Sequence, residues 1–230
     1  MKIAIMGAMP EEVAPILKKL GDYSMQEYAG NKYYEASYKG VDVVVAYSKI
    51  GKVFSTLTAT TMIEHFGCTQ LLFSGVAGAI NPELKVGDLI VATKLSQHDL
   101  DITAFGHPFG YVPEGNVYVD ADQQLIEISK NVAKNLGKSV REGIIATGDQ
   151  FVANEERKNW IGETFNADAL EMEGASVAVV CNALNVPFFI LRAISDAADM
   201  DASFSFDEFL ETSAVESAEF VMTMLDEIVK

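Results

Sequence analysis

The sequence predicts an α/β fold in which a central twisted sheet, mixed but mostly parallel, lies between two layers of helices. Three observations support this fold class. Short apolar runs with strand patterning alternate with segments of helical periodicity. The 230 residues are 49% hydrophobic and 22% charged, which is typical of a packed globular chain. No linker, repeat or low-complexity tract interrupts the sequence, so we expect one domain over residues 1–230.

The first third of the chain begins with a strand, a tight turn and a helix. Pro10, followed by Glu11 and Glu12, is a helix-start signal. Lys39-Gly40 is expected to be a hairpin turn between two strands. The elements expected here are strands at 2–6, 33–38 and 41–47, a helix from Pro10, and a helix at 52–66 with Phe54, Leu57 and Ile63 among its buried positions.

The remainder continues the alternation. The apolar run 71–74 is expected to end in a small-residue turn, Gly75-Val76-Ala77-Gly78, where a ligand can approach the main chain closely. Residues 98–116 show no periodicity but are rich in aromatic and turn residues, as functional loops often are. The other expected elements are strands at 88–93, 143–147, 169–173 and 187–194, and helices at 122–136, 155–165, from 173 to 185 and at 206–229.

Charge and composition limit the kinds of molecule that this chain can bind. Thirty-three acidic and 17 basic residues give a net charge of −16, which opposes binding to nucleic acid. Only three arginines occur, too few to clamp several phosphates, so a neutral or zwitterionic small molecule fits better. The sequence has neither a long apolar run nor a signal-peptide pattern, so we expect a cytoplasmic protein. Cys68 and Cys181 are expected to be small core residues.

Carboxylates follow or end several of the predicted strands. Glu12 lies just beyond the first strand, Glu171 and Glu173 end another, and Ser195-Asp196 follow the last. The carboxyl ends of parallel strands meet at one edge of a sheet, where ligands bind. Cleavage of a purine N-glycoside needs an acid for the leaving base and a base for the water. Each residue alone also fits a helix-start, cap or turn role.

Two segments resemble signatures of a known enzyme family. Residues 169–175, Ala-Leu-Glu-Met-Glu-Gly-Ala, and 192–196, Arg-Ala-Ile-Ser-Asp, are similar to segments of the bacterial methylthioadenosine/S-adenosylhomocysteine nucleosidases. Further similar segments, in fixed order, lie at 5–12, 48–53, 101–106, 148–151 and 205–210. The resemblance implies a nucleoside phosphorylase-like fold, hydrolysis of adenine nucleosides without metal or cofactor, and a homodimer.

The resemblance also implies roles for individual residues. Asp196 would protonate N7 of adenine with help from Ser195, Glu12 would activate the water, and Glu173 would bind the ribose hydroxyls. Arg192 and Glu171 would orient the water and Glu12, Phe151 would stack on the base, the Val152 main chain would read its edge, and Met172 would pack under the sugar. The other pocket residues that we expect are Met9, Ile50, Val76, Ala77, Gly78 and Phe206.

The irregular segment 98–116 receives a role from the same resemblance. In the family, the partner subunit closes the tail pocket with the segment that here contains Ile102, Phe105, His107 and Pro113. His107 on its own would more often be a surface histidine. His98, beside Asp99 and Asp101, suggests a metal at first sight, but a lone histidine is weak evidence and the family uses no metal.

One position departs from the family pattern. Many members have a serine where this chain has Val76, and the loss of that serine would alter a polar contact near the ribose. The surrounding residues 74–78 and 44–49 are similar to members that also hydrolyse 6-amino-6-deoxyfutalosine in the alternative menaquinone pathway. The expected substrates are therefore methylthioadenosine, S-adenosylhomocysteine, 5'-deoxyadenosine and aminodeoxyfutalosine. The alternatives are a purine nucleoside phosphorylase and a non-catalytic nucleoside-binding protein.

Overall fold

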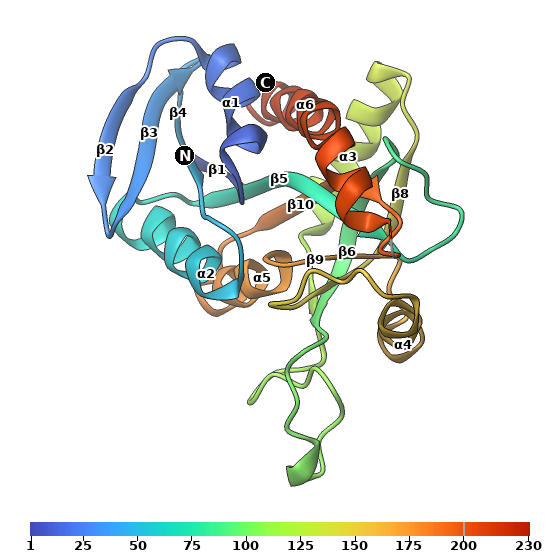
Figure 1. The fold of residues 1–230 in the computed structure, drawn as a ribbon. Coiled ribbons are helices and arrows are strands. Elements are labelled where there is room, and N and C mark those ends of the chain that lie inside the picture. Colours follow the sequence, from blue (N-terminus) through green and yellow to red (C-terminus); the bar gives the residue numbers. More distant parts are fainter. Residues whose placement is uncertain (200) are drawn as a thin grey trace.

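Within residues 1–199 and 201–230, which the computed structural model describes, ten strands pair into one mixed sheet with helices on both faces (Figure 1). The strands are β1 (Lys2–Gly7), β2 (Ser24–Tyr28), β3 (Asn31–Tyr38), β4 (Val41–Tyr47), β5 (Gln70–Ala79), β6 (Leu89–Gln97), β7 (Tyr118–Asp120), β8 (Val140–Thr147), β9 (Ala169–Glu171) and β10 (Phe188–Asp196). The helices are α1 (Pro10–Leu20), α2 (Lys52–Thr60), α3 (Gln123–Leu136), α4 (Glu155–Phe165), α5 (Gly174–Ala183) and α6 (Ala202–Ile228), with a π-helical turn at Thr61–His65 and a 3-10 turn at Thr103–Phe105.

The sheet has two parts that share β5. On one side β1 and β4 continue into the β3 and β2 hairpin, and on the other side β10, β6, β8 and β9 lead back to β5. The pairings therefore close into a ring of five strands. More positions pair in parallel than in antiparallel register, which confirms the predicted mixed, mostly parallel sheet. The ring was not part of the sequence prediction.

The helices form the two outer layers. Helices α1, α3 and α6 pack together over one face of the sheet, while α2 and α5 pack against each other on the opposite face (Figure 1). The central strands are buried on both sides: β1, β5 and β10 consist almost entirely of buried residues, and the middle of β4 is buried as well. Cys68 and Cys181 are buried core residues, as predicted. None of the helices in the described residues is long and apolar enough to cross a membrane.

Three sequence expectations were wrong in detail. Residues Gly75–Gly78 are not a turn: they continue β5, because β10 pairs with them residue by residue. Strand β2 was missed because all five of its residues are exposed and show no burial alternation. Phe54 and Leu57 were expected to be buried, but both are exposed, since they lie on the outer face of α2.

The segment 98–116 differs from the rest of the chain in its position. It leaves the end of β6, extends away from the body of the molecule and returns at β7 (Figure 1). Its only regular element is the short turn at Thr103–Phe105 within the described residues. Phe105, at the end of that turn, is 81% exposed.

Candidate active site

Glu12 is held at the junction of β1 and α1. Its helix begins immediately after the strand, at Pro10, so that the carboxylate folds back onto the connecting turn and the neighbouring strand. Oε2 accepts hydrogen bonds from the backbone amides of Ala8 (2.5 Å) and Met9 (3.0 Å), and Oε1 accepts one from Val76 (3.0 Å). The residue is only 2% exposed. Burial raises the pKa of Glu12, while Arg192 and the three amides oppose the rise.

Asp196 is the last residue of β10. Its Oδ2 accepts a hydrogen bond from the Ser195 hydroxyl (2.9 Å), and its Oδ1 accepts one from the Ala198 amide (2.8 Å). Burial raises the pKa of Asp196, and the Ala198 amide and the Ser195 hydroxyl offset part of the rise. A carboxyl group with a raised pKa stays protonated closer to neutral pH, as a general acid requires.

Two glycines of β5 make room for these two carboxylates. A Cβ atom added to Gly75 would lie 2.8 Å from Oε1 of Glu12, and one added to Gly78 would lie 2.7 Å from Oδ1 of Asp196. Both separations are shorter than real Cβ contacts, so any side chain at either position would displace a carboxylate. The small residues that were expected to let a ligand approach therefore also admit two acidic side chains.

A buried ion pair lies behind the pocket. Arg192, in the middle of β10 and 1% exposed, donates from Nη2 to Oε2 of Glu171 at 2.7 Å. Glu171 also accepts hydrogen bonds from the Thr147 hydroxyl and the Gly174 amide, which fix its orientation. The guanidinium stacks on the Phe73 ring, 4.0 Å from its centroid. Its positive charge is thus buried next to several carboxylates and is already paired with one of them.

Glu173 is the carboxylate between the strand end of β9 and the start of α5. It is buried, and its Oε1 accepts a hydrogen bond from the backbone amide of Gly51 at 2.8 Å. Burial, together with the negative charge of Glu171, raises the pKa of Glu173 to about 8. With this pKa, Glu173 changes its protonation state close to neutral pH.

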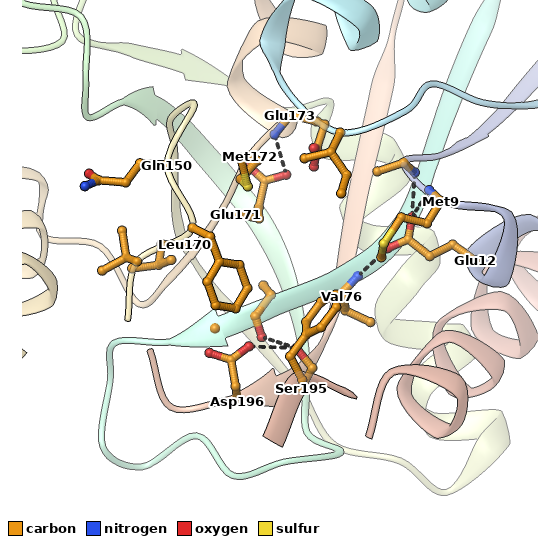
Figure 2. A pocket seen from close by; sticks show the side chains of 17 residues that line it. Met9, Glu12, Val76, Gln150, Leu170, Glu171, Met172, Glu173, Ser195 and Asp196 are labelled. Atoms are coloured by element: carbon orange, nitrogen blue, oxygen red, sulfur yellow. Dashed lines mark hydrogen bonds between the residues drawn. The ribbon is translucent and has the colours of Figure 1, made fainter. Parts of the chain in front are cut away.

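These side chains line one pocket of about 540 Å³, including its open mouth. Figure 2 shows Glu12 and Met9 at one side of it, Ser195 and Asp196 at another, and Glu171, Met172 and Glu173 along a third wall. The sequence-predicted residues that line it are Met9, Glu12, Ile50, Val76, Ala77, Gly78, Phe151, Val152, Glu171, Met172, Glu173, Ser195, Asp196 and Phe206. The Phe151 and Phe206 rings meet edge to face, with centroids 5.6 Å apart.

Some residues differ from the sequence expectation. Arg192 does not line the pocket, because its guanidinium lies behind Glu171. Ala8, Gln150 and Leu170 line the pocket but were not predicted. Each is adjacent in sequence to a predicted residue or segment, so neighbourhood was the available signal. Ala8 and Leu170 are apolar and Gln150 is exposed, so none has a chemical signature of its own.

The four residues expected to serve the partner subunit lie outside this pocket. Ile102, Phe105, His107 and Pro113 all belong to the extended segment 98–116 and do not line the pocket of their own chain. The His107 ring stacks on Tyr111, with centroids 4.3 Å apart. His98, at the root of the segment, is buried, and its Nδ1 lies 3.2 Å from Nη2 of Arg157. Among the described residues, no group of three or more His, Cys, Asp or Glu side chains is arranged to hold a metal ion.

Comparisons with known proteins agree with this geometry. A family model described as "Phosphorylase superfamily" matches residues 2–227. The aminodeoxyfutalosine nucleosidase of Campylobacter jejuni is 58% identical over 99% of this chain and 100% of its own length. The methylthioadenosine/S-adenosylhomocysteine nucleosidase of Anoxybacillus flavithermus is 38% identical over the full length of both. The solved futalosine hydrolase of Helicobacter pylori superposes with a TM-score of 0.98, at 49% identity, over 99% of this chain and 98% of that one.

Proposed function

Because this chain belongs to the phosphorylase superfamily and, within it, to the family of the aminodeoxyfutalosine and methylthioadenosine/S-adenosylhomocysteine nucleosidases, we propose that it hydrolyses the N-glycosidic bond of adenine nucleosides. One observation supports hydrolysis most strongly. Glu12 and Asp196, which are 184 positions apart in the sequence, line the same pocket. Cleavage by water needs two groups of this kind, one to protonate the base and one to deprotonate the nucleophile.

The steps follow from the two carboxyl groups. Glu12 takes a proton from the water as its oxygen attacks C1' of the ribose, and the C1'–N9 bond breaks with its electron pair going to adenine. Asp196 donates a proton to N7 of the leaving base. The products are adenine and the free sugar, and a proton returns from Glu12 to Asp196 through solvent. The raised pKa values of both groups suit these roles, because they make Glu12 a stronger base and keep Asp196 protonated.

The remaining lining residues fit the parts of an adenine nucleoside. We assign the ribose hydroxyls to Glu173 and the base to Phe151, whose ring offers a stacking surface, with the Val152 main chain at the base edge. Met172 and Met9 pack against the sugar. Glu171 forms part of the pocket wall and Arg192 lies behind it, and their ion pair fixes that wall. Val76 contributes its backbone amide to Glu12, a contact that does not depend on the side chain at this position.

Phosphorolysis is the alternative reaction for a protein of this superfamily. A phosphate nucleophile would need cationic groups beside the ribose. Among the described residues that line the pocket there is neither lysine nor arginine, and the nearby Arg192 is paired with Glu171. Glu12, which must be ionised to act as a base, would repel a phosphate ion. Water is therefore the better nucleophile for this site.

The proposed substrates are methylthioadenosine, S-adenosylhomocysteine, 5'-deoxyadenosine and aminodeoxyfutalosine. The first two are named in the description of the Anoxybacillus flavithermus relative, and the last in that of the more similar Campylobacter jejuni relative. The test is adenine release from each nucleoside in phosphate-free buffer. We expect adenine and the free sugar to form in the absence of phosphate. Comparison of kcat/KM between the nucleosides then ranks them as substrates. A strict requirement for phosphate would overturn hydrolysis in favour of the phosphorylase.

The pocket of one chain is expected to be completed by a second copy. Val53, Phe54 and Leu57 are exposed and lie on one face of α2, because Leu57 follows Val53 by four positions and Phe54 by three. Ile50, which is also exposed, lies in the turn just before the helix. Ile50 also lines the pocket, so this apolar face is continuous with the pocket wall. We propose a homodimer in which the face is covered and the segment with Ile102, Phe105, His107 and Pro113 reaches the partner's pocket.

A further inference from the structure

A ring of three polar contacts lies just outside the pocket. Nζ of Lys52 donates to Oδ1 of Asp99 (2.6 Å), the Asp149 amide donates to Oδ2 of Asp99 (2.8 Å), and the Lys52 amide donates to Oδ1 of Asp149 (2.7 Å). None of these residues lines the pocket. The ring joins three segments that are far apart in sequence: the start of α2, the root of the segment 98–116, and the loop after β8.

Two of the joined segments are walls of the pocket. Lys52 follows Ile50 and Gly51, and Asp149 precedes Gln150 and Phe151. Ile50, Gln150 and Phe151 all line the pocket. Asp99 accepts from both segments at once, one bond to each of its oxygens, and so fixes the distance between them.

The turn before α2 needs such support. Lys49 and Gly51 both have left-handed backbone, with φ of 74° and 101°. A Cβ atom on Gly51 would lie 3.0 Å from Oδ1 of Asp149, so the ring packs directly against this glycine. The amide of the same glycine donates to Oε1 of Glu173. The ring therefore determines where the Gly51 amide is placed relative to Glu173.

The ion pair within the ring is well shielded. The side chains of Lys52 and Asp99 are 19% and 25% exposed. Burial alone would raise the pKa of Asp99, but the Lys52 ammonium and the Asp149 amide together lower it, so Asp99 stays ionised at neutral pH. Nζ of Lys52 also donates to the Gln97 side chain at 3.2 Å, which restricts it further.

We propose that Asp99 is a positioning residue, which acts through Lys52, Asp149 and the Gly51 amide to hold Glu173 in the orientation that recognises the ribose hydroxyls. The proposal rests on the function given above, because it takes Glu173 to be the ribose-binding group. Without Asp99, the turn at Gly51 is released and Glu173 loses its fixed donor. The loss should fall on substrates that have the hydroxyl bound by Glu173.

The test compares two substrates, methylthioadenosine and its 2',3'-dideoxy analogue, which lacks both hydroxyls assigned to Glu173. In Asp99→Ala we expect kcat/KM for methylthioadenosine to fall by about 10- to 100-fold, whereas kcat/KM for the dideoxy analogue changes little. Lys52→Gln should also lower the ratio of kcat/KM for methylthioadenosine to kcat/KM for the analogue. If Asp99 had a purely structural role, its loss would lower kcat/KM equally for both substrates and leave their ratio unchanged.

Asp226→Ala is the matched control. Asp226 also accepts from a lysine at 2.6 Å (Lys39) and from a second donor, the Tyr38 hydroxyl at 2.9 Å, but it lies away from the pocket. Its loss should leave both substrates unaffected. If Asp99→Ala does not fold, the same ratio of kcat/KM values can be measured in Asp99→Asn, which keeps the shape of the side chain and removes its charge.

The outcomes separate this proposal from the proposed function. Equal losses for both substrates, or no loss in either, in variants of an active enzyme would overturn the positioning role alone. If the unchanged protein releases no adenine from methylthioadenosine or from any other adenine nucleoside, the proposed function fails, and the positioning role fails with it.

Discussion

The backbone amide of Val76 donates a hydrogen bond of 3.0 Å to Oε1 of Glu12, and this contact holds the carboxylate of one segment against strand β5 of another. Two residues further along the same strand, Gly78 faces Asp196, with room for the carboxylate only because glycine has no side chain. Strand β5 therefore fixes the positions of both acidic groups, and the predictions below follow from that arrangement.

Gly78→Ala should separate chemistry from stability. The added methyl group would lie 2.7 Å from Oδ1 of Asp196 and must displace it, so we expect kcat to fall by about 10²-fold. Gly143→Ala is the control, since its methyl group would lie 2.5 Å from Oδ2 of Asp168, outside the pocket. Steady-state kinetics below the melting temperature of both variants should show a loss of kcat for Gly78→Ala alone. Equal kcat values would rule out the proposed fit between Gly78 and Asp196.

Ser195→Ala should change the pH profile. Burial raises the pKa of Asp196, and the hydrogen bond from Ser195 offsets part of that rise. Removing the hydroxyl therefore raises the pKa of Asp196 further. A general acid works in its protonated form, so the alkaline limb of kcat/KM against pH should move to higher pH. A limb that stays in place, or moves to lower pH, is incompatible with Asp196 as the acid.

Glu173→Gln should alter how stability depends on pH. The pKa of Glu173 is raised from its ordinary value of 4.5 to about 8 in the folded chain, so the native state binds this proton more tightly than the unfolded chain does. Stability from this group is present below about pH 4.5 and is lost as pH rises towards 8, by at most about 1.4 kcal/mol per pH unit. Gln cannot titrate. Denaturant unfolding at several pH values should show the free energy of unfolding of the variant gaining on that of the unchanged protein as pH rises.

The sequence predicted the layers and most elements because periodicity depends on burial, and most of these elements are half or fully buried. It also predicted the carboxylates that line the pocket, since charged residues at the ends of apolar strands are conspicuous. The sequence prediction failed where tertiary contacts decide the secondary structure or the neighbours of a residue. Gly75–Gly78 extend β5 only because β10 pairs with them, and β2 has no buried face at all. Nothing in the local pattern around Asp99 shows that Lys52 and Asp149 meet there.

The exposure of Phe54 and Leu57 has a similar cause. Their helical spacing correctly indicates an apolar face, but the pattern does not say whether the chain itself or a second copy covers that face. Arg192 illustrates the opposite limit: its neighbours in sequence point to the pocket, yet its pairing with Glu171 places it behind the wall. Spacing predicts which face a residue is on, and packing decides what lies opposite.

Val53→Asp should dissociate the proposed homodimer. Val53 is 75% exposed in the single chain, and a charge there would be buried without a partner when two copies associate. We expect sedimentation to give twice the chain mass for the unchanged protein and a shift towards the chain mass for the variant. Val215→Asp is the control: Val215 is exposed on α6, away from the α2 face. A monomeric unchanged protein would contradict the dimer, as would an unaffected mass for Val53→Asp.

The most direct test of the two-carboxylate account is to measure binding and turnover of methylthioadenosine by Glu12→Gln and Asp196→Asn. Both substitutions preserve shape and remove the ability to exchange a proton. We predict that each variant folds and keeps most of its affinity for the nucleoside, while adenine release slows by about 10²- to 10⁴-fold. Turnover close to that of the unchanged protein in either variant would contradict the account.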